Sequence, residues 1–214
     1  VIYNIGELTA IDMSKAIHYY SLAAYQNHLK AQFFLGEIYF KGPYGIKKDI
    51  NKAIQFYSMA ANQNHSISQN ILGLIYYTGE YITQDINKSI YYFSLASNNN
   101  DTNALNNLGS IYYLGKYKKR DINKAIHYFT LSANKNDFNA QFILGFIYYF
   151  GQYIPRDINK ALHNFSLAAN KNHPKALYYL GEIYYKGKHI TRDINKAIYY
   201  FTLAANKNDL DAQF

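Results

Sequence analysis

Seven histidines are the side chains of this sequence best suited to bind a metal ion or to transfer a proton. His18, His127 and His163 occupy one equivalent position of a pattern that recurs about every 36 residues. Equivalent positions of neighbouring helical repeats should lie about 10 Å apart or more, whereas bonds to a metal are about 2 Å long. The sequence also lacks an HExxH pattern, so we expect no metal site and no cofactor.

Nucleophiles and acid–base pairs give no stronger indication of an enzyme. The chain has no cysteine, which excludes thiolate nucleophiles, thiolate metal sites and disulfides. Its 14 acidic residues are mostly aspartates at positions that suit helix caps, and no pair suggests acid–base catalysis. GxSxG, P-loop and GxGxxG patterns are absent as well. We therefore predict a protein that is not an enzyme.

The composition is that of a folded chain with a basic surface. Of the 214 residues, 49% are hydrophobic and 17% are charged, whereas disordered chains combine few apolar residues with high charge. The net charge of +8 is compatible with an anionic partner, or with compositional drift towards Lys, Asn, Ile and Tyr. No apolar run approaches the length of about 18 residues that a membrane helix needs. No targeting peptide can be read, so the sequence does not identify a compartment.

A repeat explains why the same residue types return at fixed spacing. The hexapeptide DINKAI occurs at 49–54, 121–126 and 193–198, with DINKSI at 85–90 and DINKAL at 157–162. A Leu-Gly pair and a second glycine recur with the same period. Such periods indicate small units that must stack in order to bury their apolar faces. The markers are Asp49, Asp85, Asp121, Asp157 and Asp193, preceded by Asp12; Gly36, Gly73, Gly109, Gly145 and Gly181; and Gly42, Gly79, Gly115, Gly151 and Gly187.

Each period contains two amphipathic helical segments, which we name helix A and helix B. Helix A contains the Leu-Gly pair, as in NALNNLGSIYYLG, and helix B begins at the aspartate, as in DINKAIHYFTLSAN. The aspartate favours an N-cap for helix B, and the asparagine that ends helix B favours a left-handed turn. These asparagines are Asn27, Asn64, Asn100, Asn136, Asn172 and Asn208, and the predicted caps of helix A are His28, His65, His173, Asp101, Asp137 and Asp209.

One glycine in each period lies inside helix A, where it costs about 1 kcal/mol relative to alanine. Gly36 and its equivalents recur in every unit, which indicates a packing reason. We expect helix B to cross so close to this glycine that no side chain fits. Alanine pairs of helix B, such as Ala60-Ala61, are the predicted facing surface.

The combined pattern resembles the Sel1-like repeat, a relative of the tetratricopeptide repeat. It reads A-x-x-x-L-G-x-x-Y-x-x-G, then a loop, then D-x-x-K-A-x-x-[YF]-[YF]-x-x-A-A, and it covers essentially the whole chain. The chain departs from the family at Asn64 and its equivalents, where Gly is usual, and at Asn164 in helix B. The resemblance implies an all-α fold, a right-handed α-α superhelix or solenoid of about five to six helix-turn-helix repeats. It also implies a scaffold or adaptor, since proteins with these repeats generally bind other proteins.

We expect residues 1–214 to form a single repeat array, with periods that begin near residues 29, 65, 101, 137 and 173. The segment VIYNIG at 1–6 matches the end of a helix A, and DLDAQF at 209–214 matches the start of another. Neither end has the polar capping helix that solenoids need for solubility. The sequence therefore suggests a slice of a longer array.

In the family that the sequence resembles, helix A lines the concave surface. Helical periodicity places Leu35, Ile38 and Tyr39 towards the core and positions 33, 37, 40 and 41 roughly opposite. A row of aromatic side chains there suits recognition of a peptide or protein. The sequence leaves open whether these rings instead pack between neighbouring repeats. The predicted partner-binding residues are Phe33, Glu37, Phe40, Lys41, Leu74, Tyr77, Tyr113, Phe142, Phe146, Tyr149, Tyr178, Glu182 and Tyr185.

Positive charge gathers near the loops between helix A and helix B. This basic edge could bind nucleic acid or an acidic surface, or it could be a solvated edge whose lysines are partly offset by the capping aspartates. Helical repeats read RNA from their concave helices, where these residues are not concentrated, so we expect a protein partner rather than nucleic acid. A third possibility is an accessory array of a larger enzyme. The basic edge comprises Lys47, Lys48, Lys118, Lys119, Arg120, Arg156, Lys188 and Arg192.

Overall fold

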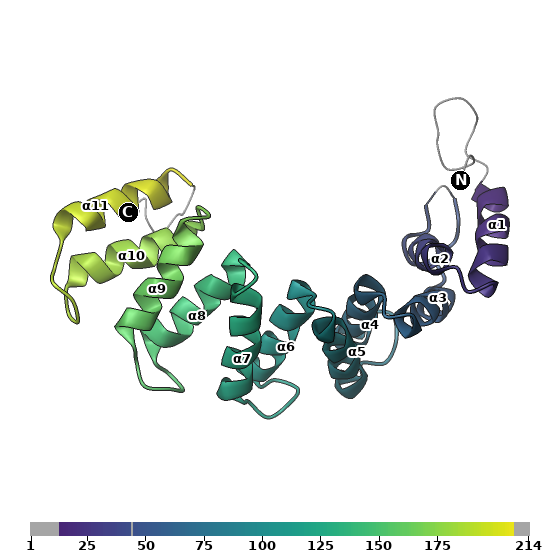
Figure 1. The fold of residues 1–214 in the computed structure, drawn as a ribbon, viewed down its shortest axis with the longest axis horizontal. Helices are drawn as coiled ribbons and strands as arrows, with labels where there is room; N and C mark the ends of the chain where they lie inside the picture. The colour runs from purple at the N-terminus through teal and green to yellow at the C-terminus, as the bar shows by residue number, and fades with distance from the viewer. Residues whose placement is uncertain (1–12, 44, 208–214) are drawn as a thin grey trace. The chain divides into compact units, whose positions relative to one another are not determined.

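The computed structural model describes residues 13–43 and 45–207, and these residues form eleven α-helices and no strand. The chain divides into two compact units, one ending at Ala104 and the other beginning at Leu105. The first unit contains α1 to α5, the second contains α7 to α11, and the boundary falls within α6 (Figure 1). The bounds are α1 (Met13–Tyr25), α2 (Leu29–Lys41), α3 (Ile50–Asn62), α4 (Ser66–Thr78), α5 (Ile86–Asn98), α6 (Thr102–Leu114), α7 (Ile122–Ala133), α8 (Phe138–Phe150), α9 (Ile158–Ala169), α10 (Pro174–Lys186) and α11 (Ile194–Ala205).

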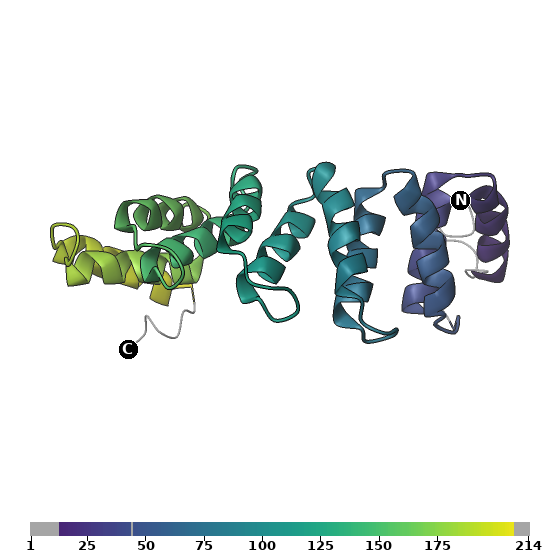
Figure 2. The same cartoon turned by 90° about the horizontal axis from the view of Figure 1, so that it is seen from below.

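The helices alternate between the two predicted types. Helix A corresponds to α2, α4, α6, α8 and α10, and helix B corresponds to α1, α3, α5, α7, α9 and α11. Each helix A packs on the helix B that follows it, as in α2 with α3 and α8 with α9, and the pairs can be followed in Figure 2. The predicted all-α solenoid of helix-turn-helix repeats is therefore confirmed. None of the described helices combines the length and the apolar character that crossing a membrane requires.

Local chemistry sets both ends of the helices as predicted. The aspartate before each of α3, α5, α7, α9 and α11 is the N-cap, and its carboxylate accepts the backbone N–H three residues later at 2.9–3.0 Å. His28, His65 and His173 cap helix A through Nδ1, and Asp101 and Asp137 do so through a carboxylate. The asparagines at 27, 64, 100, 136 and 172 have φ between 59° and 66°. The predicted caps Asp12 and Asp209 and the turn residue Asn208 lie outside the described residues.

The glycine inside helix A faces an aromatic ring of helix B. A Cβ on Gly73 would lie 2.5 Å from Cδ1 of Phe93, and a Cβ on Gly145 would lie 2.5 Å from Cδ1 of Phe165. Close crossing was predicted correctly, but the predicted partner was wrong. The nearest atoms belong to the ring rather than to the alanine pair, because the flat ring fills the space that the missing side chain leaves. The contact is repeated by Gly36 with Tyr57, Gly109 with Phe129 and Gly181 with Phe201.

In most helix pairs, a second aromatic contact stacks a tyrosine of helix A on a ring of helix B. Tyr76 of α4 stacks on Tyr92 of α5 with centroids 5.7 Å apart and an angle of 4° between the rings. Lys88 lies 5.1 Å from the centroid of Tyr76 and also pairs with Asp85 at 3.8 Å. Each capping motif therefore adds a cation–π contact with the tyrosine of helix A. The same arrangement joins Tyr39 to Phe56, Tyr112 to Tyr128 and Tyr184 to Tyr200, whereas Tyr148 faces a repeat that has Asn164 at this position.

Buried amides link the helix A segments α2 and α4 to the turns on both of their sides. Gln69 donates from Nε2 to Ala61 O at 2.9 Å, and its Oε1 accepts from Asn99 Nδ2 at 3.2 Å. Gln32 makes the corresponding bonds to Ala24 O and Gln63. Buried polar atoms that are paired in this way fix the register of the helices without a desolvation penalty. The pattern breaks at Gln141, whose Oε1 is buried without a hydrogen-bond partner among the described residues.

Candidate functional site

A pocket of about 740 Å³ lies between the two helix A segments α8 and α10. Tyr149 and Phe150 line it from the end of α8, and Arg156 lines it from the loop that follows. Tyr178 and Tyr179 of α10 form the opposite wall. Further lining residues are Ile158, Glu182, Ile183, Lys186, Lys188 and His189.

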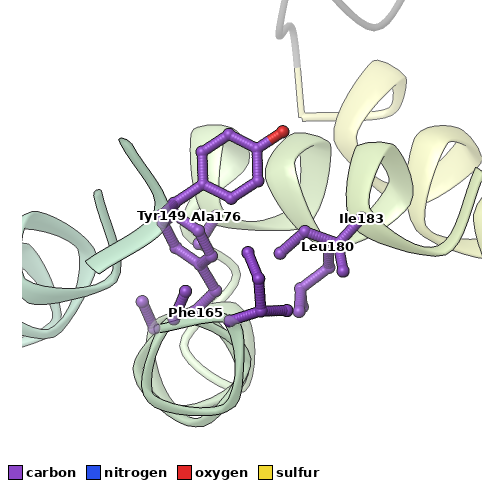
Figure 3. Close-up of a cluster of buried hydrophobic side chains, with 8 residues drawn as sticks. Tyr149, Phe165, Ala176, Leu180 and Ile183 are labelled. Carbon is purple, nitrogen blue, oxygen red and sulfur yellow. The ribbon is translucent and has the colours of Figure 1, made fainter. Parts of the chain in front are cut away.

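Packed aromatic and aliphatic side chains form the floor of this pocket. Tyr179 lies 5.3 Å from Phe165 with nearly parallel rings, and 5.5 Å from Tyr149. Figure 3 shows Tyr149 and Phe165 beside Leu180 and Ile183, with the hydroxyl of Tyr149 directed away from this cluster. Because cores packed in this way resist rearrangement, the pocket is held in shape without a ligand.

A polar network crosses the pocket between the two helices. The Tyr149 hydroxyl donates to Glu182 Oε2 at 2.9 Å, and Lys186 forms an ion pair with the same carboxylate. Burial raises the pKa of Tyr149, and the hydrogen bond to Glu182 raises it further. Contact with Glu182 also raises the pKa of Lys186, chiefly through the hydrogen bond. The phenol therefore stays neutral and the ammonium stays charged, so the charge of Glu182 is compensated within the pocket.

The rim of the pocket is basic. The guanidinium of Arg156 lies 4.8 Å from the ring centroid of Tyr149, and it makes no hydrogen bond or ion pair with any residue that the structure describes. Lys188 and His189 are exposed beside it. The carboxylate of Asp157 does not pair with Arg156, because it caps α9 and forms an ion pair with Lys160 at 3.4 Å. The hydrogen bond from the N–H of Lys160 lowers the pKa of Asp157.

A pocket at the equivalent position of the first unit lies between α2 and α4. It measures about 340 Å³, and Phe40, Lys41 and Leu74 line it. Here Tyr57 donates to Glu37 Oε1 at 2.6 Å, and Glu37 forms an ion pair with Lys41. Burial raises the pKa of Tyr57 strongly, and Glu37 adds to this rise. A Tyr–Glu–Lys network therefore occurs in both pockets, although the tyrosine comes from helix B in one and from helix A in the other.

The predicted partner-binding residues fall into three groups. Those that meet in pockets are Glu37, Phe40, Lys41 and Leu74 in the first unit and Tyr149, Tyr178 and Glu182 in the second. Phe33, Phe142 and Phe146 are half-buried behind the pockets, where they contact Tyr57, His173 and Tyr179. Tyr77, Tyr113 and Tyr185 lie outside both pockets.

The predicted aromatic row is not uniformly exposed. Tyr149 is only 5% exposed, whereas Tyr185 at the equivalent position is 52% exposed. Phe40, Tyr77 and Tyr113 are half-buried. Packing between repeats, the alternative that the sequence left open, therefore holds for Tyr149, because α10 covers it, while Tyr185 has no later helix A among the described residues to cover it.

The basic edge contains two kinds of residue. Arg120 donates to the carbonyls of Tyr113 and Leu114 at 2.8 and 3.0 Å, and Arg192 donates to the carbonyl of Tyr185 at 2.9 Å. These arginines satisfy carbonyls that the end of helix A leaves open. Arg156 instead lies at the rim of the larger pocket. The lysines of the edge, all exposed, are Lys47, Lys48, Lys118, Lys119 and Lys188.

Sequence reasoning missed several residues that line the pockets. Phe150, Tyr179 and His189 line the larger pocket, and Tyr57 lines the smaller one. Tyr57 carried a signal, because it is a tyrosine in a helix B position that holds phenylalanine in the four following repeats. Across residues 13–43 and 45–207, no three histidine or acidic side chains converge into a group that could hold a metal ion.

Comparisons with known proteins place the chain among repeat proteins. The Sel1 repeat family model matches residues 1–28, 29–65, 66–101, 102–137, 139–173 and 174–209. No curated protein sequence matches the chain. A solved structure of a protective antigen present in uropathogenic Escherichia coli strains, displaying an SLR fold, is 28% identical with a TM-score of 0.87. That match covers 99% of this chain and 45% of the antigen.

A Sel1 repeat protein from Oxalobacter formigenes is also 28% identical, with a TM-score of 0.83. The match covers 98% of this chain and 60% of that protein, so the chain spans about half the length of these two structures. Five of the family matches each span one described helix A and the helix B that follows it, although the match at 139–173 begins one residue after the start of α8. Because the six matches together run from residue 1 to residue 209, the chain belongs to the Sel1 repeat family.

Proposed function

We propose that this chain is a non-catalytic interaction module that binds a segment of a partner protein between consecutive helix A segments. Sel1 repeat proteins generally act as protein-interaction scaffolds. The observation that carries the proposal is the recurrence of a pocket at the same repeat position, between α2 and α4 and between α8 and α10.

The chemistry of both pockets suits a peptide. Each combines an aromatic floor with a few polar groups, the composition typical of peptide- and ligand-binding pockets. Phe150 is 50% exposed at the mouth of the larger pocket, and Leu74 is exposed at the smaller one. Exposed rings beside a pre-formed hollow supply contact area with little loss of side-chain entropy.

Selection from a displayed library of random peptides tests this proposal. The bait is the 214-residue chain, compared with a pocket variant that carries Leu74→Ser and Phe150→Ser. A matched control carries Tyr91→Ser and Tyr199→Ser, which remove two exposed rings from helix B. Circular dichroism confirms that all three are helical before selection.

We expect the parent and the helix B control to enrich the same peptides, and the pocket variant to lose them. Equal retention by all three proteins would place binding outside the helix A pockets. If the folded parent enriches no peptide above the level of an unrelated protein, the proposed function is wrong.

A further inference from the structure

We propose that the pocket between α8 and α10 selects an acidic segment, in which an aspartate or glutamate side chain stands next to a bulky apolar side chain. This inference rests on the proposed function and names the ligand of one of its two pockets. The pocket is charged as well as aromatic, and its charges are not balanced within the described residues.

The positive charge of the lining exceeds the negative charge. Arg156, Lys186 and Lys188 carry three positive charges, and Glu182 carries one negative charge, so the net charge is +2 with His189 neutral. Lys186 compensates Glu182 directly. Arg156 and Lys188 are therefore left to attract an anion from outside, and a carboxylate is the anion that a peptide side chain supplies.

Arg156 is equipped for this contact in a way that its equivalents are not. Arg120 donates from Nε and Nη2, and Arg192 donates from Nε, to carbonyls at the end of helix A. Arg156 lies against the ring of Tyr149, and its N–H groups have no acceptor within the described part of the chain. An aromatic support holds the guanidinium in place while its N–H groups stay available, which reduces the entropy lost when a carboxylate binds.

The apolar neighbour follows from the walls beside these charges. Phe150 stands half-exposed at the mouth, and Tyr178 lies on the opposite helix. A leucine, phenylalanine or tyrosine of the ligand would bury apolar surface against these rings, which favours binding. The acidic side chain alone would gain little from an exposed ion pair, so the proposal requires both.

The equivalent pocket in the first unit provides an internal contrast. Glu80 occupies the position that Lys188 occupies in the larger pocket. Lys41 is the one positive group lining that pocket, against the carboxylates of Glu37 and Glu80, so its net charge is −1. The two pockets share a scaffold and differ in sign, and an acidic segment should therefore discriminate between them.

Two displayed peptide libraries test the proposal. They are identical except that one encodes aspartate and glutamate wherever the other encodes asparagine and glutamine. The baits are the parent chain, the single variant Lys188→Glu and the double variant Arg156→Glu with Lys188→Glu. The control, Lys118→Glu with Lys119→Glu, makes the same change in net charge on an exposed loop outside the pocket.

We expect the parent and the loop control to enrich acidic peptides that also contain an adjacent bulky apolar residue. Affinity for the enriched peptides should fall at least about tenfold in the double variant, because like charges then face each other. Lys188→Glu, at an exposed residue, should give a smaller loss in the same direction. Binding should also weaken between about 0.1 M and 1 M salt, where the Debye length falls from about 10 Å to 3 Å.

The outcomes separate this inference from the proposed function. Peptides enriched equally from both libraries, or retained by the double variant, would overturn the acidic ligand and leave a peptide-binding module. Failure to enrich any peptide would overturn both. If the parent binds a single-stranded oligonucleotide, the double variant loses it, and no acidic peptide is enriched, then the ligand of this basic rim is a nucleic acid.

Discussion

The hydroxyl of Tyr149 in α8 lies 2.9 Å from Glu182 Oε2 in α10, so one hydrogen bond joins helix A of one repeat to helix A of the next. Tyr149→Phe keeps the ring in the core and removes only this bond. We expect the free energy of unfolding to fall by about 1–2 kcal/mol, because the bond is charge-assisted and partly shielded from water. Urea denaturation followed by circular dichroism measures the change.

Tyr185→Phe is the matched control for that change. Tyr185 stands at the equivalent position of the following repeat, but its side chain is 52% exposed, and its ring contacts Arg192. Its hydroxyl is not used in that ring contact, so the unfolding midpoint should stay the same. Equal effects of the two substitutions would show that the Tyr149–Glu182 bond contributes nothing to stability.

A methyl group added at Gly73 should destabilise the first unit. The new Cβ would lie 2.5 Å from Cδ1 of the buried Phe93, and overpacking of this kind costs about 1–3 kcal/mol. The gain in helix propensity is about 1 kcal/mol, so a net loss is expected from Gly73→Ala. Thermal or urea unfolding measures it.

The aromatic partner gives the control. Combining Gly73→Ala with Phe93→Leu should cost less than the sum of the two single changes, because the smaller side chain makes room for the methyl group. Strict additivity would mean that the ring is not what excludes a side chain at Gly73.

His65 should make stability depend on pH. Its Nδ1 accepts the N–H of Ser68 at 3.3 Å as the cap of α4, and burial lowers its pKa below the ordinary value. The neutral ring therefore stabilises the fold above the ordinary histidine pKa. This contribution is lost as the pH falls through the lowered folded value, because the protonated ring cannot accept the N–H.

Unfolding from about pH 7.5 to about pH 5.5, on either side of the ordinary histidine pKa of about 6.5, measures this loss. His65→Asp should remove part of the dependence, since aspartate stays ionised in this range and caps helix A at Asp101 and Asp137. The cap is worth about 1 kcal/mol or less. An unchanged pH profile in His65→Asp would exclude His65 as the source.

Gln141→Leu should leave stability unchanged or raise it by about 1 kcal/mol, because it removes a buried acceptor without a described partner. Leucine already stands at the equivalent positions Leu105 and Leu177. The carbonyl of Ala133 accepts from Gln141 Nε2 and also from the N–H of Asn136, and the second hydrogen bond remains in the variant. Denaturation of the variant measures the change.

Gln69→Leu should lower the free energy of unfolding, in contrast to Gln141→Leu. Both ends of the Gln69 amide are bonded, to Ala61 O and to Asn99. Its removal leaves the Asn99 amide without that acceptor and should cost about 1 kcal/mol. Equal effects at Gln69 and Gln141 would mean that the pairing of the amides does not decide their contribution.

The sequence predicted those parts of the fold that depend on local chemistry. An aspartate cap, an asparagine in a left-handed turn and the apolar stripe of helix A each need only residues of the same repeat. The two helices per period, the caps at Asp49 and Asp85 and the turn at Asn64 were therefore predicted correctly. Repetition strengthened these inferences, because the same residue pattern occurs in several successive periods.

Features that depend on the neighbouring repeat were harder to predict. Tyr149 and Tyr185 occupy one position in the repeat, yet only Tyr149 is covered, by a helix 25 residues or more further along the chain. Nothing local in the sequence distinguishes the bonded Gln69 from a surface amide. To predict the hydrogen bond between Tyr57 and Glu37, one would need to know which ring of helix B faces which position of helix A.

The glycine of helix A and the ring that faces it belong to the same repeat, as do Gly73 and Phe93. Duplicating or deleting one whole unit of the gene therefore copies or removes both halves of the contact together. Recombination between helix A and helix B would instead separate them and could place a larger residue against an unchanged ring. The packing of the core thus favours evolution by whole repeats, while exposed pocket residues such as Glu80 and Lys188 remain free to diverge from unit to unit.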